Sequence, residues 1–222
     1  MKNMVMICAV CIFLSLTAPA KAGTITQDFD TIGASLGEGG HLIDQLSGLT
    51  FTGAYIAEEG GSPYAFWSNS PPDPPHDKAH SGQYTVTDKK GDSGPITVSF
   101  ATPVYDLSFY AMDIDTFGGK DDILTAQVFD SSHTLLNTIT ITYGQAGYDT
   151  GDCVATFVDF TSINNISSLE MRVETGNSFS GNYSGWALDD LSYTPVPVPG
   201  AIWLLGSGLI GLAAFGGRRG KS

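Results

Sequence analysis

Carboxylates stand near both ends of the main body of this sequence, where they could form a metal site. Asp28 and Asp30 lie in the first segment with β-strand character, and Asp189 and Asp190 lie in the last one. In jelly-roll-like domains the first and last strands are commonly neighbours, so these side chains could converge. Carboxylates and backbone carbonyls together supply the oxygen ligands that a hard cation such as Ca²⁺ requires. The alternative is that these acids lie in turns and at strand edges, surrounded by water.

Aromatic side chains in Gly- and Ser-rich stretches form a second candidate site, for sugars. Tyr64, Trp67 and Trp186 lie in or beside such stretches. Sugar rings present apolar C–H faces that can stack on aromatic rings, and the amide of Asn69 could hydrogen-bond their hydroxyls. The alternative is structural, because Trp67 and Trp186 are large enough to close the ends of a hydrophobic core.

Two common catalytic motifs are absent from the sequence. There is no His-Glu-x-x-His and no glycine loop of the kind that binds phosphate. His76 and His80 have a spacing that would suit Zn²⁺ on a helix, but the prolines around them disfavour a helix. We therefore expect no enzyme activity. A glycosidase-type pair of acids is a distant alternative, because acidic residues are plentiful.

The charge and cysteine content of the chain exclude some classes of partner and of stabilisation. All 23 acidic residues of the 222-residue chain lie in its main body, against five basic ones, which gives the body a net charge of −18. Nucleic acid is excluded as a partner, because binding phosphate requires a basic surface. Cys153 is the one cysteine outside the N-terminal leader, so the body has no internal disulfide.

The segments that should position these residues have the composition of β-strands. Segments rich in β-branched and aromatic residues are separated by Gly, Pro, Asn and Asp, and in Leu169–Glu174 apolar and charged residues alternate. No long segment has the 3.6-residue period of a helix. The sequence therefore predicts an all-β fold, an antiparallel β-sandwich of jelly-roll-like type. The expected strands are 24–29, 49–56, 84–87, 96–100, 104–114, 123–129, 135–143, 153–159, 166–173 and 186–193.

Both ends of the chain differ in composition from the body. Residues 1–22 carry an apolar core and a small-x-small cleavage site, as in a secretory signal peptide. Residues 195–222 begin with alternating prolines, which form an extended, stiff spacer. An apolar stretch, 201–215, follows and is about as long as the shortest membrane-spanning helices. Arg218 and Arg219 then close the chain, and positive charge there would leave the body outside the membrane.

This final segment closely resembles the PEP-CTERM sorting signal, although Val198 stands where the family's name-giving Glu would be. The resemblance implies a bacterial exported protein that is handled by an exosortase, a transpeptidase-like membrane protease. Proteins with this signal are associated with cell envelopes, exopolysaccharide and biofilm matrix. The residues that match the sorting and processing motif are Val196, Pro197, Val198, Pro199, Gly206, Ser207, Gly208, Arg218 and Arg219.

The body, residues 23–194, resembles galactose-binding-like and carbohydrate-binding jelly rolls. Those domains often hold a structural Ca²⁺ between an acid of the first strand and an Asp in a final Asp-Asp-Leu-like run. By position, the resemblance implies that Asp30 and Asp189 are the metal ligands in this chain.

Three functions therefore follow from the sequence, in order of preference. The first is a structural protein of the envelope or extracellular matrix, sorted by its tail, whose C-terminal helix lies transiently or stably in the inner membrane. The second is a glycan-binding module that uses Tyr64, Trp67 and Trp186. The third, a glycan-active hydrolase, is a distant alternative.

Overall fold

The structure is a computed structural model that describes residues 22–59, 79–88, 95–117, 120–174 and 186–197, without the side chains of Phe117, Lys120, Asp152 and Cys153. Residues Thr24–Pro195 form one compact unit, and the segments on either side of it belong to a second unit. Apart from one short hairpin, the described strands of Thr24–Pro195 pair with one another around one hydrophobic core. This unit therefore has what a domain needs to fold independently.

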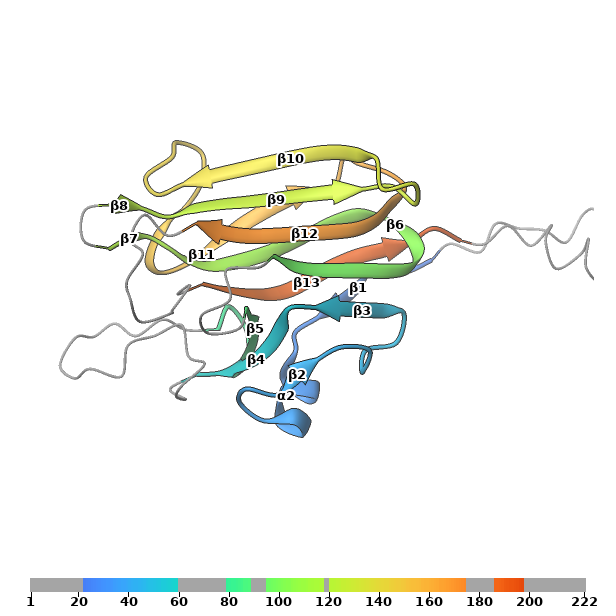
Figure 1. Cartoon of the computed structure of the whole chain (residues 1–222), viewed down its shortest axis with the longest axis horizontal. Helices are drawn as coiled ribbons and strands as arrows, with labels where there is room; N and C mark the ends of the chain where they lie inside the picture. Colours follow the sequence, from blue (N-terminus) through green and yellow to red (C-terminus); the bar gives the residue numbers. More distant parts are fainter. Residues whose placement is uncertain (1–21, 60–78, 89–94, 118–119, 175–185, 198–222) are drawn as a thin grey trace, which may run out of the picture. The chain divides into compact units, whose positions relative to one another are not determined.

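The strands form an antiparallel fold in which one long strand belongs to two layers (Figure 1). The first layer contains the strands that pair with one another at the top of Figure 1, followed by the first part of the long strand and one more strand. In order across the layer these strands are β10 (Leu135–Thr142), β9 (Ile123–Phe129), β12 (Ile166–Glu174), the first part of β6 (Ile96–Ile114) and β3 (Leu49–Thr52).

The second layer is built around the other part of β6. β11 pairs with one side of β6, and the last strand of the domain pairs with its other side. The first strand, β1, lies against the last one, with Ile25 opposite Tyr193. In order across the layer the strands are β11 (Gly151–Phe160), β6, β13 (Ala187–Pro195), β5 (Tyr84–Thr87), β4 (Ala54–Glu58) and β2 (His41–Leu42), with β1 (Ile25–Gln27) also beside β13.

β6 passes from one layer to the other near Pro103. Val98 and Ser99 pair with β12, whereas Tyr110 and Ala111 pair with both β11 and β13. Proline cannot donate to a strand ladder, and Asp106 has a positive φ of 52°. Both features bend β6, so it contributes to the two layers in turn. The sequence predicted two separate strands here, 96–100 and 104–114.

One hydrophobic core joins the two layers. Val98, Val128 and Leu169 of the first layer belong to the same buried cluster as Phe109 and Leu188 of the second. The strands alternate as predicted: in β12 the apolar residues are buried, and the charged residues between them are half-buried or exposed. The predicted antiparallel all-β fold is confirmed, with two layers facing a common core.

Several short elements add to the predicted strands. α2 (Asp30–Leu36) is a seven-residue helix that begins after Phe29 in the left-handed region. Gly53, with a φ of 73°, separates β3 from β4 where one strand was expected. A side chain there would meet the carbonyl oxygen of Pro95, 2.8 Å from the position of a Cβ. β7 (Thr116–Phe117) and β8 (Lys120–Asp121) form a small separate hairpin.

Candidate functional site

Part of the predicted sites lies outside the described residues. This holds for Tyr64 and Trp67, for the signal peptide and for the sorting motif from Val198 onward. Val196 and Pro197 are described and follow β13 without regular structure. Within the described ranges, no helix has the length and apolar character needed to cross a membrane.

Trp186 is a core residue, which contradicts its predicted role in sugar stacking. Its side chain is fully buried and belongs to the main hydrophobic cluster. Its carbonyl accepts a hydrogen bond from Thr87 Oγ1 at 2.7 Å, which fixes the start of β13 against β5. Ala187 and Leu188 beyond it are buried as well, so the chain enters the core at this point.

The two predicted metal ligands hold the same short segment, Ser81–Tyr84, from two sides. Asp30 Oδ1 accepts the backbone N–H groups of Gln83 at 2.7 Å and Tyr84 at 3.1 Å. Asp189 Oδ2 accepts the N–H of Ser81 at 2.9 Å. Between these donors lies Gly82, whose φ is 63°. A Cβ on Gly82 would overlap the Asp30 carboxylate, so the approach of Asp30 requires glycine.

Asp189 is buried in an environment that disfavours its charge. Its side chain is inaccessible to solvent, and burial raises its pKa to about 7. The hydrogen bonds from the N–H groups of Ser81 and Asp190 lower the pKa, while the charges of Asp190 and Asp30 raise it further. Desolvation of a carboxylate and repulsion by neighbouring carboxylates act in the same direction. A positive charge beside Asp189 would offset both the desolvation and the repulsion.

His80 lies next to these acids and packs on an aromatic ring. Its Nδ1 is 2.6 Å from Asp190 Oδ2, and Ser81 Oγ donates to Asp190 Oδ1 at 2.8 Å. The imidazole stacks on the ring of Tyr110, with centroids 3.5 Å apart and planes 11° apart. His76, whose spacing to His80 would suit zinc on a helix, lies outside the described residues. His80 itself pairs with Asp190 and stacks on Tyr110.

The described residues fit the predicted calcium site in donor type. Asp30 and Asp189 are carboxylates, the ligand class that Ca²⁺ prefers. No group of three or more His, Cys, Asp and Glu side chains gathers around one point within the described ranges. A cation between Asp30 and Asp189 would therefore take its remaining oxygen ligands from backbone carbonyls and water.

Three side chains form a row across neighbouring strands of the second layer. Tyr110 of β6 is the register partner of Phe157 on β11 and of Asp189 on β13. The rings of Tyr110 and Phe157 are 5.1 Å apart and tilted by 49°. We call Phe157, Tyr110 and Asp189 the cross-strand row. The row lies on the face of the layer that points away from the main core, since Phe109 and Val158 beside it point into that core.

Exposure decreases along the cross-strand row. Phe157 is 45% exposed, Tyr110 is half-buried under His80, and Asp189 is fully buried under Ser81. The row therefore offers an exposed aromatic ring at one end and a carboxylate cluster at the other. Phe157 was not predicted from the sequence. Its signal was the alternation in β11, where buried Val158 and Phe160 place Phe157 on the opposite face.

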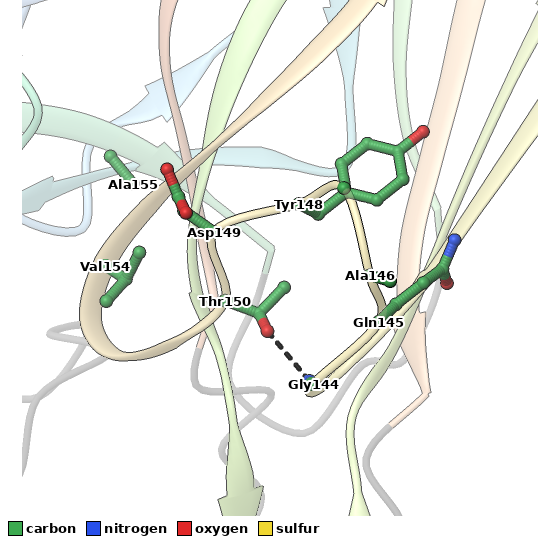
Figure 2. A pocket seen from close by; sticks show the side chains of 9 residues that line it. Gly144, Gln145, Ala146, Tyr148, Asp149, Thr150, Val154 and Ala155 are labelled. Carbon is green, nitrogen blue, oxygen red and sulfur yellow. Dashed lines mark hydrogen bonds between the residues drawn. The ribbon is translucent and has the colours of Figure 1, made fainter.

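An open hollow of about 540 Å³ lies beside the row, between the β10–β11 loop and the start of β11 (Figure 2). Ala155 lines the hollow and also packs against the small cluster that Tyr110 contacts. The loop is held by bonds from side chains to backbone: Gly144 N–H donates to Thr150 Oγ1 at 2.8 Å, and Thr156 Oγ1 donates to the Asp149 carbonyl at 2.6 Å. The hollow is lined by Gly144, Gln145, Ala146, Gly147, Tyr148, Asp149, Thr150, Val154 and Ala155.

The hollow and the row combine groups that suit a hydroxyl-rich ligand with apolar faces. Asp149 is exposed and can accept hydrogen bonds, and Gln145 and Tyr148 lie at the wall of the hollow (Figure 2). Phe157 offers an exposed ring face near by. Sites for small polar molecules commonly combine such a hollow with a few polar groups.

Comparison with known proteins shows only distant structural likeness. No protein-family profile and no curated protein matches the sequence. A DUF4465 family protein from Bacteroides caccae has a TM-score of 0.43 and 13% identity, covering 82% of this chain and 96% of that one. TmCBM61, solved with β-1,4-galactotriose, has a TM-score of 0.30 and 11% identity, covering 68% of this chain and 86% of its own. At these values neither likeness bears on what this chain binds.

Proposed function

We propose that this chain is an exported module of the cell envelope or extracellular matrix that binds polysaccharide and has no catalytic activity. The observation that carries the proposal is the cross-strand row, in which Phe157 is exposed beside Tyr110. An apolar ring on a solvated sheet face provides a surface on which the C–H face of a sugar can stack. The carboxylate of Asp149, which lines the hollow together with Ala155, offers an acceptor for sugar hydroxyls.

The arrangement around Asp190 does not have the order of a nucleophilic site. In a nucleophilic site, Ser Oγ donates to His, and the carboxylate orients the His from its other side. Here His80 Nδ1 and Ser81 Oγ both hydrogen-bond to the carboxylate of Asp190. Ser81 is therefore not activated by His80. This cluster serves instead to hold the Ser81–Tyr84 segment on the sheet.

The sequence of the tail supports the proposed route to the envelope. The proline spacer, the apolar stretch with Gly206-Ser207-Gly208 and the final Arg218-Arg219 pair match a sorting signal read by an exosortase. In this proposal the tail enters the inner membrane, is processed by an exosortase, and delivers the sandwich to the outer envelope, the cell surface or the matrix. A purely structural role there is the alternative function.

A structural Ca²⁺ bound by Asp30 and Asp189 is part of the proposal. The support is the fully buried side chain of Asp189, whose nearest charges, Asp190 and Asp30, are also negative. Bound cation would supply the missing positive charge and fix α2 to β13 through these two acids.

The experiment is retention of the domain, residues 23–195, on insoluble and extracted bacterial polysaccharides. Wild type should be retained, and Phe157→Ala should lose affinity by about fivefold to a hundredfold, because stacking on an aromatic ring contributes about 1–3 kcal/mol in comparable systems. The matched control is Ile25→Ala on β1, which removes another exposed apolar side chain away from the row. If Phe157→Ala and wild type are retained equally, Phe157 is not part of a glycan site. If no polysaccharide retains the wild type, the glycan-binding function is wrong and the structural role remains.

A further inference from the structure

β10 is an edge strand with one free side. It pairs with β9 along one side, and no described strand pairs with its other side. It lies at the top edge of the first layer in Figure 1. A free strand edge presents a row of N–H and C=O groups that can pair with a further strand.

Two local hydrogen bonds show which groups of β10 point outward. Thr138 N–H donates to Asn137 Oδ1 at 2.8 Å, and Thr142 N–H donates to Gln145 Oε1 at 3.1 Å. Because alternate residues of a strand direct their backbone groups to the same side, the N–H of Thr140 points outward with them. These bonds define the outward side of the strand. At Thr138 and Thr142 a flexible side-chain carboxamide accepts the hydrogen bond that a neighbouring strand would otherwise accept.

The surroundings of this edge differ from the rest of the domain in charge and polarity. Between Ser131 and Tyr148 there is no Asp, Glu, Lys or Arg, although the body as a whole carries a net charge of −18. Leu135, Leu136 and Tyr143 are 49%, 37% and 39% exposed, and these three are half of the exposed large apolar side chains in the described residues. Natural edge strands are commonly protected by charged side chains, and β10 has none.

We propose that β10 pairs antiparallel with β10 of a second copy of this chain, which joins two first layers into one continuous sheet. Charge favours this occupant: two such acidic domains repel each other over most of their surface, and this edge allows close approach without bringing charges together. Antiparallel pairing of identical strands is two-fold symmetric, so each copy supplies the same residues. The register shift between Leu135 and Asn137 confines the pairing to Asn137–Thr142. This inference does not depend on the proposed glycan site.

The test measures the mass of the domain, residues 23–195, by light scattering and sedimentation across a range of concentrations. Wild type should shift to twice the monomer mass as concentration rises. Thr140→Glu should remain a monomer, because two-fold pairing would place two negative charges close together. Thr140→Pro should also remain a monomer. It removes an outward N–H, which leaves the pairing of β10 with β9 intact.

Thr50→Glu is the matched control, since Thr50 is also an exposed threonine, on β3 at the opposite edge of the first layer. It adds the same charge and should dimerise like wild type. Melting curves of all variants establish that each is folded. A wild type that stays monomeric at every concentration would overturn the proposal, as would dimers of folded Thr140→Glu and Thr140→Pro, or loss of dimers in Thr50→Glu.

Discussion

Asp30 and Asp189, separated by almost the whole domain in sequence, hydrogen-bond to opposite ends of one four-residue segment. Asp30 binds the N–H groups of Gln83 and Tyr84, and Asp189 binds that of Ser81. The segment thereby bridges the helix that follows the first strand and the last strand itself. Because Asp189 is buried among like charges, this bridge should respond to protonation and to cations.

Protonation of Asp189 should make the domain more stable in mild acid than in mild base. Its pKa rises from an ordinary value of 3.8 to about 7 in the folded state. Between these values the folded protein binds more protons than the unfolded chain, so the free energy of unfolding falls as pH rises from about 4 to about 7. Urea unfolding in chelator should therefore give a lower free energy at pH 8 than at pH 5, by a few kcal/mol at most.

Asp189→Asn isolates this contribution, because an amide resembles the protonated acid in having one acceptor and one donor group. The variant should lose less stability than wild type between pH 5 and pH 8. Part of the dependence should persist, since burial also raises the pKa of Asp122 to about 7. If Asp189→Asn and wild type lose the same amount, Asp189 is not the group that titrates.

Millimolar Ca²⁺ should raise the melting temperature of the domain, because a ligand that binds only the folded state stabilises it by mass action. Asp189→Ala should abolish the gain, and Asp30→Ala should reduce it. Both variants should also be less stable than wild type in chelator. Asp189→Ala removes the acceptor of the Ser81 N–H, and Asp30→Ala removes the acceptor of the Gln83 and Tyr84 N–H groups. If the melting temperature of a metal-free preparation changes with neither Ca²⁺ nor chelator, the domain does not bind the cation.

Trp186→Ala should destabilise the domain by about 3–5 kcal/mol, because it leaves a large cavity in the core. Trp186→Phe should cost clearly less, since the ring remains and the indole Nε1, which has no hydrogen-bond partner, is removed. Denaturant unfolding measures both. Polysaccharide retention of Trp186→Phe should match that of wild type. If either variant stayed as stable as wild type but was no longer retained by polysaccharide, Trp186 would belong to the binding site and not to the core.

Reversing the charge of Arg218 and Arg219 should leave the protein mis-sorted, because the positive end that orients the tail in the membrane is lost. The double Glu variant should accumulate in the wrong cell fraction or remain unprocessed. The double Lys variant keeps the charge and should be sorted like wild type. Cell fractionation and immunoblotting distinguish them, and normal sorting of the Glu variant would exclude a role for this charge.

Most strands could be predicted because they alternate with a period of two between the core and the outside. β5 and β9 have the predicted bounds, and β12 differs from its prediction by one residue. α2 was missed because seven residues are too few to establish a helical period. The continuity of β6 was missed because Pro103 reads as a break in sequence, while in the fold it marks the change of layer.

The candidate site could be predicted only where it depends on the ends of the domain. The expectation that first and last strands are neighbours is confirmed by the pairing of Ile25 with Tyr193, and it brings Asp30 near Asp189. The Ser81–Tyr84 segment, which both acids hold, comes from the middle of the chain, and nothing in its sequence indicates that contact. Trp186 was a candidate for sugar stacking because it adjoins a Gly- and Ser-rich stretch, with a place in the core as the alternative. The buried side chain agrees with the alternative, because Trp186 belongs with the strand that follows it.

The pairing of β1 with β13 also determines when this domain can fold. Thr24 Oγ1 and Thr194 Oγ1 are 3.0 Å apart although they are 170 positions apart in the chain. β1 therefore has no partner until the last strand has been synthesised, and closing so long a loop makes folding slow. Under the proposed export, such a delay would help the chain to cross a membrane before it folds.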